Sequence, residues 1–297
     1  MTDWANESLY PGWGQRFAVS RRLATETTAF QSIEVIDTAS HGPVLLLDGV
    51  VQVTARDEFV YQEMIAHVPL LLHGDARRVL IIGAGDGGVL RRVLQHRTVT
   101  RAVMVEIDAA VIRLSRLYLP DVGGTAWDDP RATVLIEDGI AYVAAAAAAA
   151  AAGAFDVIIV DSTDPNGPGE VLFSEAFYRD CSRILGPRGI LANQGGVPFM
   201  QAEELAASTA RRATAFASVS AFVVAVPTYV GGFMAIGVAS NAPLDPVPDV
   251  AKIAHRADRA GLTGCRYWSP AVQAAAFALP PYIAAALHPP LTPGAKP

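Results

Sequence analysis

The feature of this sequence that most constrains its fold is a pair of apolar runs, each followed by a loop that contains acidic residues. Residues 79–82 lead into the glycine-rich loop 83–88, and residues 157–160 lead into the acidic loop 161–168. In an open parallel sheet, the loops that follow the strands lie at the carboxyl edge, where such folds bind ligands. The first loop lets backbone approach a nucleoside and the second presents two carboxylates, so we expect a nucleoside cofactor that faces a cationic substrate.

The composition fits an acidic globular protein. With 297 residues, of which 52% are hydrophobic, the chain can bury a full core and form one large domain and a small one. Its formal net charge of -6 argues against nucleic acid or an anionic membrane as the main partner, because both attract clustered Lys and Arg. The acidic balance is compatible with a small polycationic molecule.

Cysteine and histidine usage gives no indication of a metal site. The two cysteines, Cys181 and Cys265, lie far apart, and the six histidines are scattered without metal-ligand spacing. We therefore expect neither a metal nor a disulfide framework, and a reducing cytoplasm is the expected location. The N-terminus has no basic segment followed by an apolar one, so no signal peptide is expected.

Residues up to about 54 have the pattern of β-strands, with strand-like runs at 17–19 and 31–36 and an Asp48-Gly49 hairpin signal between two apolar runs. From Asp57 onward the apolar period changes to that of an amphipathic helix, which we expect Pro69 to end. We therefore predict an N-terminal β domain over residues 1–56 and a Rossmann-like catalytic domain over residues 57–297.

Strands and helices alternate through the second domain. Strand-like runs occupy 79–82, 102–105, 133–136 and 155–160, and later ones lie at 189–193, 221–226 and 233–239. Repeated strand–helix units predict an α/β fold with a Rossmann-like, doubly wound parallel sheet of the S-adenosylmethionine-methyltransferase type, beside the small N-terminal β-strand domain. The alanine run at 144–152 favours a helix between two of these strands.

Acidic residues at consecutive strand ends predict an adenosine pocket. The glycine loop alone does not distinguish a nucleotide site from an ordinary turn. Glu106 ends the next strand, close to the roughly 20 residues after the loop that are typical of an acid that binds ribose hydroxyls. Asp138-Gly139 ends the third strand, where a carboxylate can accept from an adenine amino group. Each acid alone has the alternative role of a helix cap, but together they favour a nucleoside site.

Asp86 lies inside the glycine loop, where it would repel a phosphate. This position disfavours a dinucleotide and favours a nucleoside without phosphates, such as S-adenosylmethionine or a relative of it. Ordinary methyltransferases usually carry an acid two residues before the first glycine of this loop. Ile81 occupies that position here, so the acid of this loop follows the first two glycines.

At this point the sequence resembles the spermidine synthases, which are polyamine aminopropyltransferases. The resemblance extends from Trp4 to about Tyr282, and its motifs lie at residues 47–52, 57–64, 83–88, 105–108, 161–165, 227–229 and 275–280. It implies transfer of an aminopropyl group from decarboxylated S-adenosylmethionine to a diamine, with release of methylthioadenosine. Putrescine is the first expected acceptor, and no metal cofactor is implied.

The resemblance also implies roles for individual residues. Asp161 is expected to accept the proton of the attacking amine. The residues expected to bind the substrates are Tyr61, Asp86, Asp161, Asp164 and Tyr229. Those expected around the nucleoside are Gln31, Gln62, Gly83, Gly85, Asp86, Glu106, Asp138, Gly139 and Pro168. Without the resemblance, Asp161 and Asp164 would also suit the capping of a turn, and the tyrosines would suit a core.

Asp86 is expected to contact the ammonium of the donor, near the place that the carboxylate of intact S-adenosylmethionine would reach. Two like charges about 4 Å apart repel by roughly 4 kcal/mol at an effective dielectric constant of 20. That energy corresponds to roughly a thousandfold discrimination against S-adenosylmethionine. Asp86 is therefore expected to select the donor as well as to bind it.

Four residues depart from the family pattern, namely Asn166, Trp268, Ser269 and Gln273, and they put the length and identity of the acceptor in doubt. The nearest alternative is the same reaction on cadaverine, agmatine or spermidine. Two further alternatives are an S-adenosylmethionine-dependent methyltransferase, disfavoured by Asp86 and Ile81, and a non-catalytic polyamine-binding protein. By resemblance, we expect a homodimer or homotetramer that binds small molecules and neither nucleic acid nor membrane.

Overall fold

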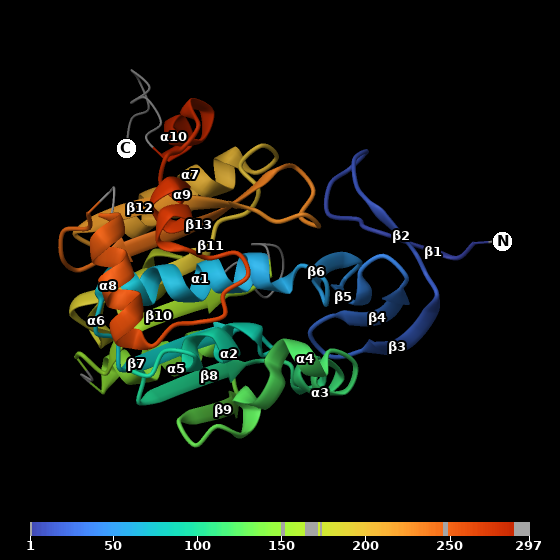
Figure 1. Ribbon diagram of the computed structural model, residues 1–297, viewed down its shortest axis with the longest axis horizontal. Helices are drawn as coiled ribbons and strands as arrows, with labels where there is room; N and C mark the ends of the chain where they lie inside the picture. The colour runs from blue at the N-terminus through green and yellow to red at the C-terminus, as the bar shows by residue number, and fades with distance from the viewer. Residues whose placement is uncertain (1, 150–151, 164–171, 173, 246–248, 288–297) are drawn as a thin grey trace.

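Two small β-sheets built from the first 54 residues stand beside a seven-stranded sheet built by the rest of the chain (Figure 1). The structure is a computed structural model that describes residues 2–149, 152–163, 172, 174–245 and 249–287. The first small sheet pairs β1 (Trp4–Asn6) with β2 (Arg16–Ala18). The second is an antiparallel meander of β3 (Arg21–Thr27), β4 (Ser32–Thr38), β5 (Gly42–Leu47) and β6 (Val50–Thr54).

The turn between β5 and β6 confirms the hairpin that the sequence predicted. Asp48 and Gly49 both have positive φ, at 49° and 76°, as a tight two-residue hairpin turn requires. One face of this meander is apolar and packs against α3 (Ala109–Tyr118) of the larger part of the chain. Ile33, Val35 and Leu45 are essentially fully buried in that contact. The small sheet is therefore fixed to the helix that follows β8.

The large sheet has the strand order β12-β13-β11-β10-β7-β8-β9. Its strands are β7 (Arg78–Gly83), β8 (Arg101–Glu106), β9 (Ala132–Ile136), β10 (Phe155–Asp161), β11 (Leu185–Gln194), β12 (Ser218–Ala225) and β13 (Phe233–Ser240). The order reverses between β7 and β10, which is the switch point at which such sheets bind ligands. The doubly wound sheet is confirmed. Strand β13 runs antiparallel because the loop at 226–232 is too short for the crossover of about a dozen residues that a parallel strand needs.

Helices cover both faces of the large sheet (Figure 1). One face packs against α1 (Glu58–His73), α2 (Gly88–Leu94), α8 (Val250–Ala260) and α9 (Pro270–Ala276). The other face packs against α5 (Gly139–Ala148), α6 (Glu175–Ile184), α7 (Ala202–Ala213) and α10 (Pro281–Leu287). The short α4 (Pro120–Gly123) and the 3₁₀ turn η1 (Gly124–Asp128) lie between α3 and β9.

Helix α1 does not end at Pro69, so that part of the prediction is wrong. The helix continues to His73 and ends at Gly74, whose φ of 85° is typical of a helix C-cap. Proline removes one backbone hydrogen bond from a helix. Leu70 and Leu71, each 2% exposed, follow the proline directly, and their burial against the sheet stabilises the last turn.

The alanine run begins inside α5, which confirms the predicted helix for residues 144–148, while residues 150–151 lie outside the described part of the chain. The predicted domain boundary at residue 56 falls in the connection between β6 and α1, and as a boundary it stays a prediction. Of the helices that the structure describes, none alone has the length and apolar character to cross a membrane; the bent pair α9 and α10 meets that test only when the two are counted together.

Candidate active site

The ends of β7, β8 and β10 lie side by side at the carboxyl edge of the large sheet and face the small sheet. A cavity of about 290 Å³ opens there. Its lining includes every predicted site residue that the structure describes: Gln31, Tyr61, Gln62, Gly83, Gly85, Asp86, Glu106, Asp138, Gly139, Asp161 and Tyr229. The predicted Asp164 and Pro168, and the departure Asn166, lie outside the described residues.

The glycine loop is pressed against the end of β10. Gly83 has a φ of 79°, and a Cβ atom at this position would lie 2.2 Å from the carbonyl oxygen of Asp161. The amide of Ala84 donates to that same oxygen at 3.0 Å. Ala84 itself has a φ of 60°, a conformation that residues other than glycine rarely adopt. The contact between the two loops therefore depends on glycine at position 83.

Glu106 points from the end of β8 toward the glycine loop. A Cβ atom on Gly85 would lie 2.8 Å from its Oε2 atom, so the missing side chain leaves room for this carboxyl group. The amide of Asp108 donates to Glu106 Oε1 at 2.9 Å. Burial raises the pKa of Glu106 to about 7, although that hydrogen bond acts in the opposite direction. The carboxyl is thus held in place at the cavity.

Asp86 is oriented by two hydrogen bonds from groups that carry no charge. The amide of Gly88 donates to Oδ1 at 2.7 Å, and Gln62 Nε2, from α1, donates to Oδ2 at 3.0 Å. Burial raises the pKa of Asp86 to about 8, and the nearby Asp161 adds to that effect. Both hydrogen bonds act to lower the pKa, but burial dominates.

Asp161 forms the carboxyl end of β10 and accepts a hydrogen bond from Tyr61. The Tyr61 hydroxyl, one turn into α1, donates to Asp161 Oδ1 at 2.8 Å. Burial raises the pKa of Asp161 to about 6, while the Tyr61 hydrogen bond lowers it. The pKa of Tyr61 is itself raised far above its usual value by burial and by the Asp161 charge, so Tyr61 remains a donor.

Tyr229 joins the large domain to the small sheet. Its hydroxyl donates to the backbone carbonyl of Gln52 at 2.8 Å, and its ring lies edge-on to that of Tyr61 at 5.6 Å between centroids. Asp57 holds the loop before Tyr229, because its Oδ2 atom accepts from the amide and hydroxyl of Thr228 at 3.1 and 2.7 Å. This positioning contact was missed, since nothing in the spacing of Asp57 and Thr228 indicates that they meet.

Gln31 reaches the cavity from the small sheet. Its Nε2 atom donates to Asp108 Oδ2 at 3.1 Å, and the Thr28 hydroxyl donates to the same oxygen at 2.8 Å. The other oxygen of Asp108 accepts from the amide of Ala110 at 3.0 Å and so begins α3. Asp108 therefore fixes the Gln31 loop to the same segment that carries Glu106.

Asp138 has the cap role that the sequence left open as an alternative. Its Oδ1 atom accepts from the amide of Ile140 at 2.8 Å and begins α5. The side chain nevertheless lies at the mouth of the cavity, where it is exposed. The cap engages Oδ1, so capping and contact with a nucleoside are compatible at this residue.

The cavity carries a strong excess of negative charge. Its described lining contains eight acidic side chains and no Lys, Arg or His: Glu7, Asp48, Asp57, Glu58, Asp86, Glu106, Asp138 and Asp161. A site of this kind attracts cations, and a bound cation would favour the ionised form of each buried carboxyl. In the part of the chain that the structure describes, no group of three or more His, Cys, Asp or Glu residues is arranged to hold a metal ion.

Three of the departures from the family pattern lie away from the cavity lining. Trp268 Nε1 donates to Gln273 Oε1 at 2.8 Å, and both side chains are buried. Ser269 accepts from the amide of Val272 at 3.2 Å and caps α9. Trp268 also lies edge-on to His67 of α1, at 5.9 Å between ring centroids.

A nucleoside-type glycine loop, beside Asp86 and Asp161 with their uncharged hydrogen-bond partners and on a sheet of this strand order, suits a transferase that acts on a cationic substrate. Residues 58–247 match the spermine/spermidine synthase domain, and residues 3–55 match the spermidine synthase tetramerisation domain. The chain therefore belongs to the spermine/spermidine synthase family, as the resemblance predicted.

Individual relatives agree with that assignment. The polyamine aminopropyltransferase of Serratia proteamaculans is 46% identical over 282 residues, which cover 95% of this chain and 96% of the relative. Polyamine aminopropyltransferase 1 of Pseudomonas aeruginosa is 46% identical over 288 residues, covering 97% and 98%. Spermidine synthase in complex with the transition-state analogue AdoDATO superimposes with a TM-score of 0.88 at 34% identity, covering 96% and 94%. The spermidine synthase of Thermotoga maritima gives 0.87 at 33%, with the same coverage. The chain is thus an enzyme of the aminopropyltransferase type.

Proposed function

We propose that this enzyme transfers the aminopropyl group of decarboxylated S-adenosylmethionine to putrescine and forms spermidine and methylthioadenosine. The observation that carries the proposal is the cavity itself, in which Asp86 and Asp161 lie half-buried beside the glycine loop and no described lining residue is basic. Both substrates are cations, and the donor lacks the carboxylate that such a cavity would repel. The names of the relatives point to the same reaction class.

The nucleoside of the donor is assigned to the glycine-loop end of the cavity. Glu106 would accept from the ribose hydroxyls, and Asp138 with Gly139 would lie along the adenine. Gln31, Gln62 and Gly83 with Gly85 would complete this wall. The donor ammonium is assigned to Asp86, because its carboxyl is already oriented by Gly88 and Gln62 and forms no ion pair with the residues that the structure describes. Pro168 stays a prediction.

In the proposed reaction, the amine nitrogen of putrescine attacks the aminopropyl carbon bound to sulfur. The new C–N bond forms as the C–S bond breaks, the bonding electrons return to sulfur, and methylthioadenosine leaves. The attacking nitrogen must be a neutral amine, so Asp161 accepts a proton from the putrescine ammonium before the new bond forms. Deprotonating an ammonium of lysine-like pKa to the neutral amine costs about 4–5 kcal/mol at pH 7. A carboxyl with a pKa of about 6 is a better acceptor for that proton than an ordinary aspartate.

Tyr61 and Tyr229 are assigned to the acceptor side. The hydroxyl of Tyr61 holds Asp161 at 2.8 Å, so it fixes the direction from which the carboxylate meets the amine. The two rings, in edge contact, form an apolar wall suited to the methylene chain of a diamine. Such positioning can contribute roughly 7–11 kcal/mol to lowering a barrier. A contact of Asp164 with the diamine stays a prediction.

We also propose that the enzyme is a homo-oligomer, because residues 3–55 match a domain described by its role in tetramerisation. Light scattering on the purified chain would test this, and a mass equal to that of one chain would contradict it. A dimer and a tetramer remain alternatives that the same measurement separates. The cytoplasmic location stays a prediction.

Methylthioadenosine release tests the proposed reaction directly. The enzyme would be given decarboxylated S-adenosylmethionine with putrescine, cadaverine, agmatine or spermidine, each in turn. We expect putrescine to give the highest kcat/KM, with cadaverine about 10-fold or more below it, because one methylene changes such ratios by roughly 10- to 200-fold. Preference for another amine would contradict the proposal that putrescine is the acceptor. Methyl transfer from intact S-adenosylmethionine would contradict the proposal that the donor is decarboxylated S-adenosylmethionine. Tight diamine binding without turnover would favour a non-catalytic polyamine-binding protein.

A further inference from the structure

Behind the cavity, a buried arginine lies between two buried glutamates. Arg92 Nη2, from α2, donates to both carboxyl oxygens of Glu58 at 3.0 and 2.9 Å. Its Nη1 atom lies 3.9 Å from Glu63 Oε1. The exposed fractions of Glu58, Glu63 and Arg92 are 8%, 0% and 3%. We refer to these three residues as the arginine clamp.

The arginine clamp joins the two helices that present the donor site. Glu58 and Gln62 lie four residues apart on α1 and therefore share one face of that helix. Gly88 and Arg92 are related in the same way on α2. Where the helices meet, a Cβ atom on Gly88 would lie within 1.9 Å of Gln62 Oε1, so the two faces are in direct contact. The clamp is one helical turn from this contact.

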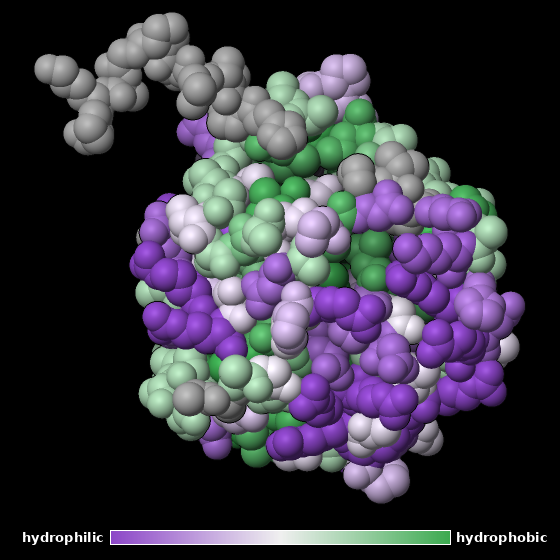
Figure 2. All heavy atoms as spheres, turned by 90° about the vertical axis from the view of Figure 1, so that its left-hand side faces the viewer, coloured by the Kyte–Doolittle hydropathy of each residue, from purple (hydrophilic) through white to green (hydrophobic). Residues whose placement is uncertain are grey.

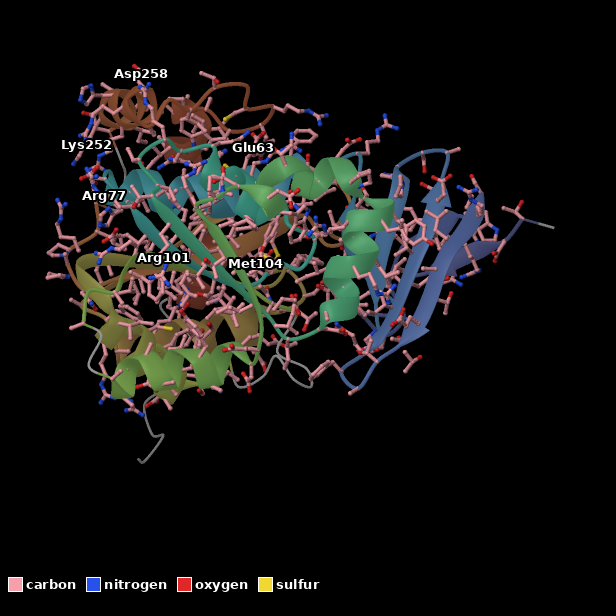
Figure 3. The ribbon with its side chains drawn as sticks, turned by 90° about the horizontal axis from the view of Figure 1, so that it is seen from below. Glu63, Arg77, Arg101, Met104, Lys252 and Asp258 are labelled. Atoms are coloured by element: carbon pink, nitrogen blue, oxygen red, sulfur yellow. The ribbon has the colours of Figure 1, made fainter. Side chains whose placement is uncertain are left out.

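The other side of the arginine clamp is tied to the segment between α8 and α9. Glu63 accepts from the amides of Arg266, Tyr267 and Trp268 at 2.8 to 3.2 Å. Figure 3 places Glu63 on α1, toward the middle of the molecule. The carboxylates that Arg92 joins thus face opposite ways: Glu58 lines the cavity and Glu63 holds the supporting segment.

We propose that Arg92 is a positioning residue of the donor site: by holding Glu58 beside α2, it sets the distance at which Gln62 on α1 donates to Asp86. The Gln62–Asp86 bond joins α1 to the loop that leads into α2, so its 3.0 Å length depends on how closely α1 approaches the start of α2. A lysine at position 92 would keep the charge but lose the planar group whose two terminal nitrogens face Glu58 and Glu63 separately. The proposal rests on the proposed donor and not on the identity of the acceptor.

A double-mutant cycle on donor affinity tests this role. Binding of decarboxylated S-adenosylmethionine would be measured by calorimetry in the wild type, Arg92→Lys, Gln62→Ala and the double variant. If Arg92 acts through Gln62, then Arg92→Lys weakens binding about tenfold in the wild type but less than about threefold beside Gln62→Ala. Glu58→Gln breaks the arginine clamp from its other end and should show the same dependence on Gln62, which keeps the test decisive if Arg92→Lys fails to fold.

Arg131→Lys is the matched control. Arg131 also holds α2, but at its far end, where it donates to the carbonyl oxygens of Leu94 and His96. We expect its effect on donor affinity, if any, to be equal in both backgrounds. An equal effect of Arg92→Lys in the two backgrounds, or no effect in either, would overturn the positioning role. Failure of the wild type to bind the donor would instead overturn the proposed function and this inference with it.

Discussion

Strand β10 carries an aspartate near each end, and the two carboxyl groups differ in their surroundings. Near the start of the strand, Asp156 accepts from the amides of Arg77 and Arg78 at 2.9 Å each and from Arg78 Nη2 at 2.8 Å. Burial acts to raise its pKa, but these hydrogen bonds outweigh burial and the pKa lies below its usual value. At the other end, Asp161 accepts from the uncharged Tyr61, and its pKa is raised to about 6.

The two aspartates differ in the hydrogen-bond donors around them: Asp156 has a charged arginine donor, whereas Asp161 has only an uncharged hydroxyl donor among the described residues. The amino edge of the large sheet is rich in arginine, and Figure 3 labels Arg77 and Arg101 there, at the end away from the small sheet. Figure 2 views the molecule from that side, where hydrophilic side chains cover much of the surface. At the carboxyl edge the described cavity lining has acids and no basic residue. The protein itself supplies a cation to Asp156 and, in the cavity, to Glu58, whereas the hydrogen bonds to Asp86 and Asp161 come from uncharged groups.

The largest effect is expected from removing the charge at the carboxyl end of β10. Asp161→Asn should lower kcat by about 10³- to 10⁴-fold, because it removes the carboxylate that we propose both accepts the proton and orients the amine. Methylthioadenosine release at saturating substrates would measure the loss. A kcat within about tenfold of the wild type would contradict the proposal that Asp161 accepts the proton.

Asp156→Asn is the control for that experiment, on the same strand and with the same change of side chain. Its activity should stay close to that of the wild type, since Asp156 lies at the far edge of the sheet and does not line the cavity. Its free energy of unfolding should fall by about 1–3 kcal/mol, because charge-assisted hydrogen bonds to Arg78 and the backbone are weakened. Equal losses of activity in the two variants would break the distinction between the two edges.

A smaller effect is expected on the choice of donor. Asp86→Asn should relax the preference for decarboxylated over intact S-adenosylmethionine by up to roughly a thousandfold, which corresponds to about 4 kcal/mol of like-charge repulsion. Competition between the two compounds for the enzyme would report the ratio of their affinities. If that ratio stays unchanged, the selection of the donor does not depend on the charge of Asp86.

The smallest expected effect is on the pH dependence of stability without substrates. Burial raises the pKa of Asp86 to about 8 and that of Glu106 to about 7, above their usual values of 3.8 and 4.5. A raised pKa means that the folded state binds more protons, so stability falls as pH rises toward the folded pKa. Each group contributes a slope of at most about 1.4 kcal/mol per pH unit. The wild type should therefore lose thermal stability between pH 6.5 and pH 8.

Opposing contributions fade across that pH range. The pKa values of His67, His73 and His96 are lowered by burial from 6.5, so their opposing contribution is largely gone by about pH 7.5, where the unfolded histidines are also mostly neutral. Asp156, whose pKa is lowered, loses its stabilising contribution only in acid. Asp86→Asn should flatten the decline in melting temperature, whereas Asp156→Asn should leave it unchanged. A decline of equal slope in all three proteins would contradict the assignment to the cavity.

The sequence predicted the carboxyl edge of the large sheet well because its information is local. Gly83, Glu106, Asp138 and Asp161 each interrupt or end an apolar run, and parallel strands bring such ends together. The meander was predicted less completely. Strand β3 (Arg21–Thr27) was missed because it is a polar edge strand with no buried residue, so hydrophobic alternation does not mark it.

Contacts that depend on tertiary packing were beyond the sequence pattern. Arginine is mostly exposed in proteins, yet Arg92 is 3% exposed, because Glu58 and Glu63 meet it from another helix. Pro69 was predicted to end α1 for the same reason. The sequence shows that a proline removes a helical hydrogen bond, but it does not show the burial of Leu70 and Leu71 that outweighs this loss. The pairing of Trp268 with Gln273 likewise became visible only when both side chains were placed.

The hydrogen bond from Tyr229 to the backbone of Gln52 has a consequence for redesign of the enzyme. It makes the proposed acceptor wall depend on both sheets, and a backbone carbonyl cannot be adjusted by exchanging a side chain. A chimaera that takes the large domain from one relative and the small sheet from another would carry mismatched halves of this wall. Altered amine preference is therefore better sought by exchanging both sheets together than by grafting either one alone.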